Sequence, residues 1–166
     1  MKILLAGEGG QGVQVVAEIL AKAAFMEGKG ALYIPNFGVE QRGGVSLGFV
    51  VLDEVEVAYP KFEKAEILVV FCDRALERIK NYIGPETRVI LSPAVTLSEI
   101  DGIRLKSTLS PKAWNIVILG KILGLQSLVS RDAVKKVMEE RFAHWFEKQP
   151  ELRELDFKAL DEGATQ

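Results

Sequence analysis

Residues 7–12 read Gly7-Glu8-Gly9-Gly10-Gln11-Gly12, a G-x-G-x-x-G pattern that follows the short apolar run at residues 2–6. From about residue 13 to residue 27, apolar side chains recur at spacings of three and four, which predicts a helix. Gly28 and Gly30 end this helix, and residues 31–34 read as a second strand that Pro35 stops. Strand, glycine turn, helix and strand form a βαβ unit, for which we predict parallel strands and a right-handed crossover.

The glycines of this turn have predicted roles. In such turns Gly7 permits the tight bend, Gly9 lets a phosphate approach the backbone, and Gly12 lets helix and strand pack closely. The helix N-terminus adds unpaired N–H groups and a partial positive charge, which suit an anion. Two interpretations stay open. One is an anion-binding loop made of Gly7, Gly9, Gly10, Gln11 and Gly12, and the other is a turn that serves only backbone geometry and subunit packing.

A dinucleotide site needs one more feature, an acidic residue about twenty positions further on that binds the ribose. Ile34, Pro35 and Asn36 occupy that place. Glu8 also puts a negative charge inside the loop, which opposes a pyrophosphate. These observations disfavour NAD, and a free-standing nucleotide-binding, Rossmann-like oxidoreductase is kept as an alternative.

The rest of the chain predicts further strands and helices. Residues 45–52 and 55–58 read as a hairpin, which adds antiparallel pairing to the sheet. Asp73 is predicted to cap a helix over residues 74–82, and Ser130 to cap a later helix with an apolar stripe. Further elements are expected at residues 67–72, 88–91 and 103–109 (strands) and 111–123 (helix).

The predicted fold class is α/β, a three-layer α/β/α sandwich with a mixed, Rossmann-like sheet. We predict a single domain over residues 1–166, since no linker, internal repeat or low-complexity segment interrupts the chain. The charged segment 151–166 is expected to be either a docking helix or a frayed tail.

Composition limits the chemistry of the chain. Of its 166 residues, 48% are apolar and 27% are charged, as in ordered proteins. The net charge of -2 provides no basic field, so nucleic acid is not an expected partner. A single cysteine, Cys72, and a single histidine, His144, supply too few ligands for an iron–sulfur cluster or a multi-histidine metal site. We predict no catalytic residue and no metal site, no membrane span, and a location in the cytoplasm.

Residues 35–44, Pro35-Asn36-Phe37-Gly38-Val39-Glu40-Gln41-Arg42-Gly43-Gly44, form the second informative stretch. Arg42 carries five donors in a rigid fork that suits carboxylate or phosphate, and Glu40 lies nearby. Gly43 and Gly44 allow a positive φ or the close approach of another backbone. Such loops usually belong to a site or an interface. The alternative is a weak Glu40–Arg42 ion pair within the chain or a solvated arginine.

Together these two stretches resemble the gamma subunit, or gamma domain, of the pyruvate and 2-oxoacid:ferredoxin oxidoreductases. The family looks like G-x-G-G-Q-G-V opening a helix, followed by P-x-x-G-x-E-x-R-G-G, which residues 7–13 and 35–44 match. Asn115 with Leu119-Gly120 is similar to a further family feature. The resemblance covers nearly the whole chain, and indolepyruvate oxidoreductases carry a related domain.

The resemblance implies a cytoplasmic hetero-oligomer that decarboxylates a 2-oxoacid, such as pyruvate or 2-oxoglutarate or a branched-chain oxoacid, and releases an acyl-CoA. Thiamine diphosphate with Mg²⁺ and the iron–sulfur clusters would lie in partner subunits: alpha and beta subunits, a ferredoxin-like delta subunit in some complexes, and ferredoxin as the acceptor. Homodimer contacts are a further option. The isolated chain should be inactive, because it has no G-D-G motif for thiamine diphosphate and one cysteine.

Within this family the resemblance implies roles for both stretches. Residues 9–12 would contact a CoA phosphate or an acidic group of a partner. Arg42, supported by Glu40, would bridge to a partner near the active site, and Gly43 and Gly44 would let that partner approach. A homo-oligomeric adaptor without a small ligand is kept as a third interpretation.

Overall fold

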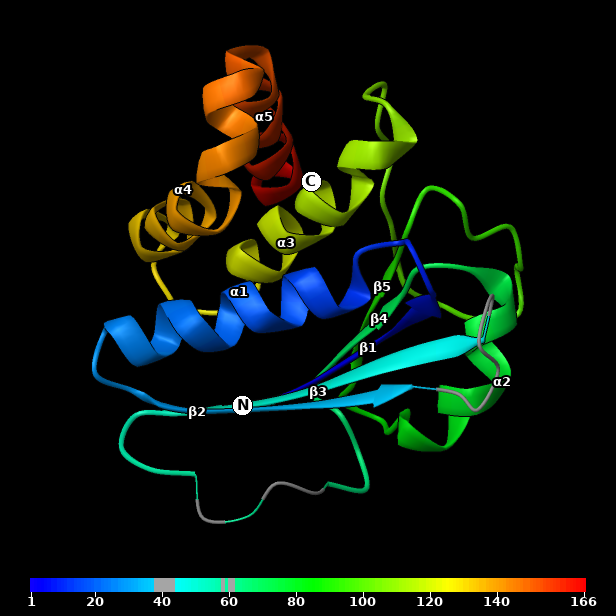
Figure 1. The fold of residues 1–166 in the computed structure, drawn as a ribbon. Helices are drawn as coiled ribbons and strands as arrows, with labels where there is room; N and C mark the ends of the chain where they lie inside the picture. Colours follow the sequence, from blue (N-terminus) through cyan, green and yellow to red (C-terminus); the bar gives the residue numbers. More distant parts are fainter. Residues whose placement is uncertain (38–43, 58, 60–61) are drawn as a thin grey trace.

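The computed structural model describes residues 1–37, 44–57, 59 and 62–166 (Figure 1). The described residues form a six-stranded sheet with the order β2-β3-β1-β4-β5-β6. The strands are β1 (Lys2–Glu8), β2 (Gly30–Phe37), β3 (Val45–Asp53), β4 (Ile67–Val70), β5 (Arg88–Leu91) and β6 (Ile103–Arg104). The central strands β1, β3 and β4 are almost wholly buried, as expected for strands covered on both faces.

The sheet is mixed because β3 lies between β2 and β1 and runs antiparallel to both. β1, β4, β5 and β6 pair in parallel. β1 and β2 therefore run in the same direction, as predicted for the βαβ unit, but they are not neighbours.

The predicted hairpin of residues 45–52 and 55–58 is wrong. Residues 55–57 belong to no strand, and residue 58 lies outside the described residues. The continuous burial of β3 explains its place, because a strand covered on both faces suits a position between two neighbours.

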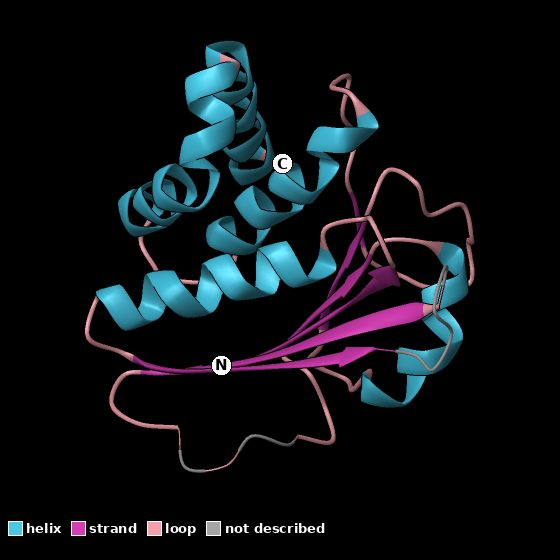
Figure 2. Cartoon of the chain, in the orientation of Figure 1, coloured by secondary structure: helices cyan, strands magenta, loops and turns pink. Residues whose placement is uncertain are grey.

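Helices cover both faces of the sheet, which confirms the three-layer α/β/α fold with a mixed sheet (Figure 2). One face packs against α1 (Val13–Met26) and α3 (Trp114–Gly124), while α4 (Arg131–Lys148) lies on α1 and α5 (Pro150–Thr165) lies on α3. The other face is covered by α2 (Leu76–Ile79) and its two flanking 3₁₀ turns, η1 (Asp73–Ala75) and η2 (Lys80–Tyr82). A further 3₁₀ turn, η3 (Pro111–Ala113), precedes α3.

Glycines bring α3 and α5 into direct backbone contact. A Cβ atom added to Gly163 would lie 1.8 Å from the carbonyl oxygen of Val117, and one added to Gly120 would lie 2.0 Å from that of Leu160. Ala159 and Leu160, next to this crossing, are fully buried. Residues 150–165 thus form a helix that packs on the core of its own chain through its smallest residues.

Asp73 does not cap the helix that follows it, contrary to the sequence-based prediction. Cys72 occupies the N-cap position and makes no side-chain cap. The Asp73 carboxylate instead accepts hydrogen bonds from the N–H groups of Thr96 (2.9 Å) and Leu97 (3.2 Å) and from the Thr96 hydroxyl. The hydrogen bond from the Thr96 side chain is the main cause that lowers the pKa of Asp73. The predicted Ser130 cap of α4 is confirmed, with its Oγ 3.1 Å from the Ala133 nitrogen.

Replacing Asp73 with Asn should lower the free energy of unfolding at neutral pH and change it little in acid. The folded-state pKa of Asp73 lies below the reference value of 3.8, so the carboxylate stabilises the fold above that pH. This contribution is lost as the pH falls through the folded-state pKa. Urea unfolding at about pH 7 and about pH 3 measures the difference. The exposed Glu86→Gln serves as the control, and a wild-type-to-variant difference that is the same at both pH values would contradict the prediction.

Candidate functional site

The glycine turn joins the end of β1 to the start of α1. The positive φ angles occur at Gly10 (93°) and at Gly12 (82°), which is the N-cap residue of α1. Gly7 lies within β1, where an added Cβ would stand 2.7 Å from the Cβ of Phe71, so this glycine serves close packing rather than the bend. Gly9 has open space around the position of a Cβ. The turn therefore leaves room for another molecule beside Gly9 and Gly10.

Gln11 stabilises the turn through hydrogen bonds to Glu8. Its side-chain oxygen accepts a hydrogen bond from the Glu8 N–H at 2.8 Å, and its own N–H donates to the Glu8 carbonyl at 3.2 Å. The Glu8 carboxylate, which the sequence places in the loop, lies 3.6 Å from the Arg74 guanidinium. This pairing partly neutralises the charge that would otherwise repel an anion.

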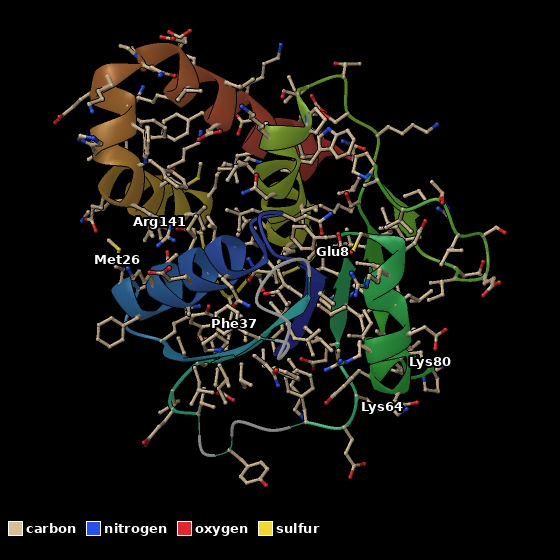
Figure 3. The ribbon with its side chains drawn as sticks, turned by 45° about the vertical axis from the view of Figure 1, so that its right-hand side comes forward. Glu8, Met26, Phe37, Lys64, Lys80 and Arg141 are labelled. Carbon is tan, nitrogen blue, oxygen red and sulfur yellow. The ribbon has the colours of Figure 1, made fainter. Side chains whose placement is uncertain are left out.

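The sheet brings the glycine turn and the two described ends of the second motif to the same edge. Glu8, at the end of β1, is opposite Val45, and Phe37, at the end of β2, is opposite Ser46. Phe37 and Gly44, the described residues on either side of residues 38–43, therefore lie at the same edge of the sheet as the glycine turn. Figure 3 labels Glu8 and Phe37 at this edge. Glu40, Arg42 and Gly43 lie outside the described residues, whereas Gly44 directly precedes β3.

A cleft of about 260 Å³ opens next to the glycine turn. Phe71 and Ser92 line it from the ends of β4 and β5, which is the edge where α/β sheets usually bind ligands. Trp114 supplies an aromatic wall and Lys112 a cationic side chain, both from the start of α3 and the turn before it. The remaining lining residues are Gly10, Gln11, Ala94, Pro111 and Asn115. An apolar cleft with a few polar groups is typical of a small-ligand site.

Asn115 stands at the junction of this cleft and the glycine turn. Its Oδ1 atom is buried and has no hydrogen-bond partner among the described residues. Its amide nitrogen lies so close to Gly12 that an added Cβ there would be 2.4 Å away. Leaving a buried acceptor unpaired costs about 1–3 kcal/mol, so the unpaired oxygen suits a ligand that donates a hydrogen bond in the cleft.

Cys72 is unsuited to nucleophilic chemistry. Burial is the main cause that raises the pKa of its thiol, and the carboxylates of Glu8 and Asp73 raise it further. A thiol with a raised pKa provides little thiolate at neutral pH. In the part of the chain that the structure describes, no group of three or more His, Cys, Asp or Glu side chains could hold a metal ion. No helix among these residues is long and apolar enough to span a bilayer.

A comparison with known protein families shows to which family this chain belongs. The family described as pyruvate ferredoxin/flavodoxin oxidoreductase matches residues 2–166. The chain belongs to this family. Within it, the chain is a gamma-type subunit, in agreement with the resemblance of its two motifs.

Two curated relatives support this place in the oxidoreductase family. The pyruvate synthase subunit PorC of Methanothermobacter thermautotrophicus is 34% identical over 155 residues, covering 86% of this chain and 85% of the relative. The 2-oxoglutarate synthase subunit KorC of Methanocaldococcus jannaschii is 30% identical over 151 residues, covering 82% and 81%. The chain is thus a subunit of a multi-subunit 2-oxoacid:ferredoxin oxidoreductase.

Two solved structures have the same fold as this gamma-type chain. The gamma subunit of a keto/oxoacid ferredoxin oxidoreductase from Geobacter sulfurreducens has a TM-score of 0.76 at 23% identity, covering 99% of this chain and 96% of its own. The 2-oxoglutarate:ferredoxin oxidoreductase of Magnetococcus marinus has a TM-score of 0.81 at 21% identity, and this chain spans 30% of that longer chain. The Magnetococcus structure contains 2-oxoglutarate, coenzyme A and succinyl-CoA.

Several cleft residues were not identified from the sequence. Ser92, Lys112 and Trp114 lie far from the glycine motif along the chain and form no local pattern with it. Asn115 was noticed only through the family resemblance. The available signal was the position of Ser92 directly after a predicted strand, since strand ends in α/β folds carry ligand contacts.

Proposed function

We propose that this gamma-type subunit binds coenzyme A at the glycine turn and the neighbouring cleft, for the CoA-dependent oxidative decarboxylation of a 2-oxoacid. The observation that carries the proposal is the meeting of the turn, Lys112 and the unpaired Asn115 oxygen at one edge of the sheet. A phosphate group can be placed against Lys112 and the open side of Gly9 and Gly10. The aromatic and apolar wall of Trp114 and Phe71 suits a planar or apolar part of the same ligand.

In this proposal the reactive cofactors are held by other chains. Thiamine diphosphate with Mg²⁺ would belong to alpha and beta subunits, and iron–sulfur clusters to a ferredoxin-like delta subunit or an equivalent partner. Ferredoxin would accept the electrons. The isolated chain would then be inactive, and the complex would work in the cytoplasm, as expected from the sequence.

Arg42, supported by Glu40, is proposed to bridge to a partner subunit, with Gly43 and Gly44 allowing its close approach. The support is positional: Phe37 and Val45, which flank residues 38–44, lie at the edge of the sheet that carries the glycine turn. Arg42→Ala should therefore lower the assembly or the turnover of the holoenzyme. Wild-type values for both would remove this role.

Replacing Lys112 with Ala should raise the KM for CoA of the purified holoenzyme about three- to tenfold, with kcat nearly unchanged. An ammonium group next to a phosphate contributes roughly 0.7–1.4 kcal/mol when partly exposed, which corresponds to this factor. Lys158→Ala, which removes an exposed lysine from α5, is the matched control and should leave the KM at its wild-type value. An unchanged KM for Lys112→Ala at low salt would contradict the proposed CoA site.

An assay of the natively purified complex would identify which 2-oxoacid is the substrate. Pyruvate, 2-oxoglutarate and branched-chain oxoacids should be compared by CoA-dependent reduction of ferredoxin. Activity that requires the purified partner subunits supports the proposed division of labour, and reduction of ferredoxin by the isolated chain would overturn it.

A further inference from the structure

The loop between β5 and β6, residues 92–102, lies wholly within the described part of the chain and forms one wall of the cleft. Ser92 and Ala94 supply this wall, and the Ala94 N–H donates to the Ser92 hydroxyl oxygen at 3.3 Å. The Val95 N–H donates to the Ser92 carbonyl at 3.0 Å, which closes a turn directly behind the wall. Residues 95–97 belong to no strand or helix, so their backbone groups need other partners.

Two side chains of opposite charge supply these partners. The Oδ1 atom of Asp73 accepts hydrogen bonds from the N–H groups of Thr96 at 2.9 Å and Leu97 at 3.2 Å. The guanidinium of Arg104, in β6, donates to the carbonyl oxygens of Val95, at 3.2 Å, and Leu97. The carboxylate therefore binds N–H groups of this stretch and the guanidinium binds its carbonyl groups, and we call the two residues the loop clamp.

The loop clamp connects two walls of the cleft. Asp73 closely follows Phe71, which lines the cleft from the end of β4. Its hydrogen bonds tie the loop after β5 to the end of β4, so Phe71 and Ser92 are held in place relative to each other. The hydrogen bond from the Thr96 side chain is the main cause that lowers the pKa of Asp73, and the positive charge of Arg104 lowers it further. The carboxylate is therefore ionised at neutral pH, and its hydrogen bonds are charge-assisted.

We propose that Asp73 and Arg104 are positioning residues that fix the Ser92–Ala94 wall of the cleft for ligand binding. Their effect on binding rests on the proposed function, because the ligand is the CoA assigned to this cleft above. Their effect on the loop does not depend on that function. The two parts are tested separately.

The first test is hydrogen exchange of the full chain, followed by mass spectrometry on the peptide that contains the Thr96 and Leu97 amides. Asp73→Ala removes the acceptor of both N–H groups, so these amides should exchange about tenfold faster. Asp73→Asn keeps an acceptor oxygen at the same place and should restore most of the protection. Glu27→Ala is the matched control, because the Glu27 carboxylate also accepts a backbone N–H, that of Ser130 at 3.0 Å, outside the cleft. It should change the exchange of the loop less than about twofold.

Arg104→Met tests the loop clamp from its other side. Arg104 is exposed, so this variant should fold even if Asp73→Ala does not. It leaves the carbonyl oxygens of Val95 and Leu97 without the guanidinium, and the loop should exchange about threefold faster or more. Unchanged exchange in Arg104→Met and in Asp73→Ala, or in Arg104→Met alone if Asp73→Ala does not fold, would overturn the proposal.

The second test is the KM for CoA of the purified holoenzyme. Asp73→Ala and Arg104→Met should each raise it about three- to tenfold with kcat nearly unchanged, whereas Asp73→Asn should have a smaller effect and Glu27→Ala none. If Lys112→Ala raises the KM but neither clamp variant does, the clamp has no role in binding, and the inference is overturned while the proposed function stands. If Lys112→Ala has no effect either, the proposed CoA site fails, and with it the role of the clamp in binding. The exchange result then decides only whether the clamp fixes the loop.

Discussion

Gly163→Ala is expected to lower the free energy of unfolding by about 3–5 kcal/mol, enough to unfold much of a marginally stable subunit. The added methyl group would lie 1.8 Å from the Val117 carbonyl oxygen and 2.9 Å from the Lys121 nitrogen, both in the backbone of α3. No change of rotamer can relieve a clash with backbone atoms, so the two helices must move apart and lose packing. Urea or thermal unfolding of the isolated subunit measures the loss.

Gly84→Ala is the matched control for this first prediction. Its added Cβ would lie 3.4 Å from the flexible Lys64 side chain, so the change should be within about 0.5 kcal/mol of wild type. Gly120→Ala should resemble Gly163→Ala, because its Cβ would meet the Leu160 carbonyl at 2.0 Å. A loss below about 1 kcal/mol for both helix variants would show that α5 does not need close contact with α3.

Asn115→Leu is expected to shift stability and ligand binding in opposite directions. Leucine has nearly the same shape and removes the buried, unpaired Oδ1 atom, so the free subunit should become more stable by about 1 kcal/mol. The same change removes the acceptor proposed for the ligand, so the KM for CoA should rise about tenfold or more. Unfolding of the isolated subunit and steady-state kinetics of the holoenzyme measure the two effects.

Asn115→Asp provides the comparison for this second prediction. It keeps an acceptor at the same place but adds a negative charge in a cleft proposed to bind phosphate, so it should also raise the KM without stabilising the subunit. If Asn115→Leu leaves the KM unchanged, the unpaired oxygen does not contact CoA. If it destabilises the free subunit as well, the amide has a structural role that its unpaired oxygen does not reveal.

Local features of the sequence predicted a large part of this fold. The glycine turn followed by the periodic apolar residues of α1 predicted a helix that ends within one residue of the observed Met26. The Ser130 cap was also predicted correctly, because capping depends on residues three positions apart. Such features are decided by neighbours in the sequence.

Features that depend on distant contacts were predicted less well. β3 reads as half of a hairpin, and only its pairing with both β1 and β2 shows that it is a central strand. Asp73 precedes a helix as a cap would, yet its carboxylate binds Thr96 and Leu97. Both errors have one cause. The hydrogen-bonding groups of a strand or of a carboxylate can pair with several different partners, and the tertiary fold decides which partner is used.

In the candidate site, too, local features could be predicted from the sequence and features that depend on distant contacts could not. The glycine turn and segment 35–44 are recognisable as motifs, and the register of β1, β2 and β3 explains why the turn and the two ends of that segment lie at one edge of the sheet. The hydrogen bonds of the Gln14 side chain to β2 and β3 could not be predicted, because a polar residue in an amphipathic helix is usually solvated. Only the closeness of Ser46, Leu47 and Tyr33 distinguishes it.

The place of β3 between β1 and β2 has a consequence for synthesis on the ribosome. β1 and β2 are two strand spacings apart, about 9.5 Å, so they do not pair with each other, and both pair with β3 instead. A nascent chain that has emerged only as far as Phe37 therefore has two unpaired strands, and α1 lacks the completed sheet on which it packs. β1, β2 and β3 can form their ladders only once Asp53, the last residue of β3, has left the exit tunnel. This subunit therefore begins to fold later than a βαβ unit whose two strands pair directly.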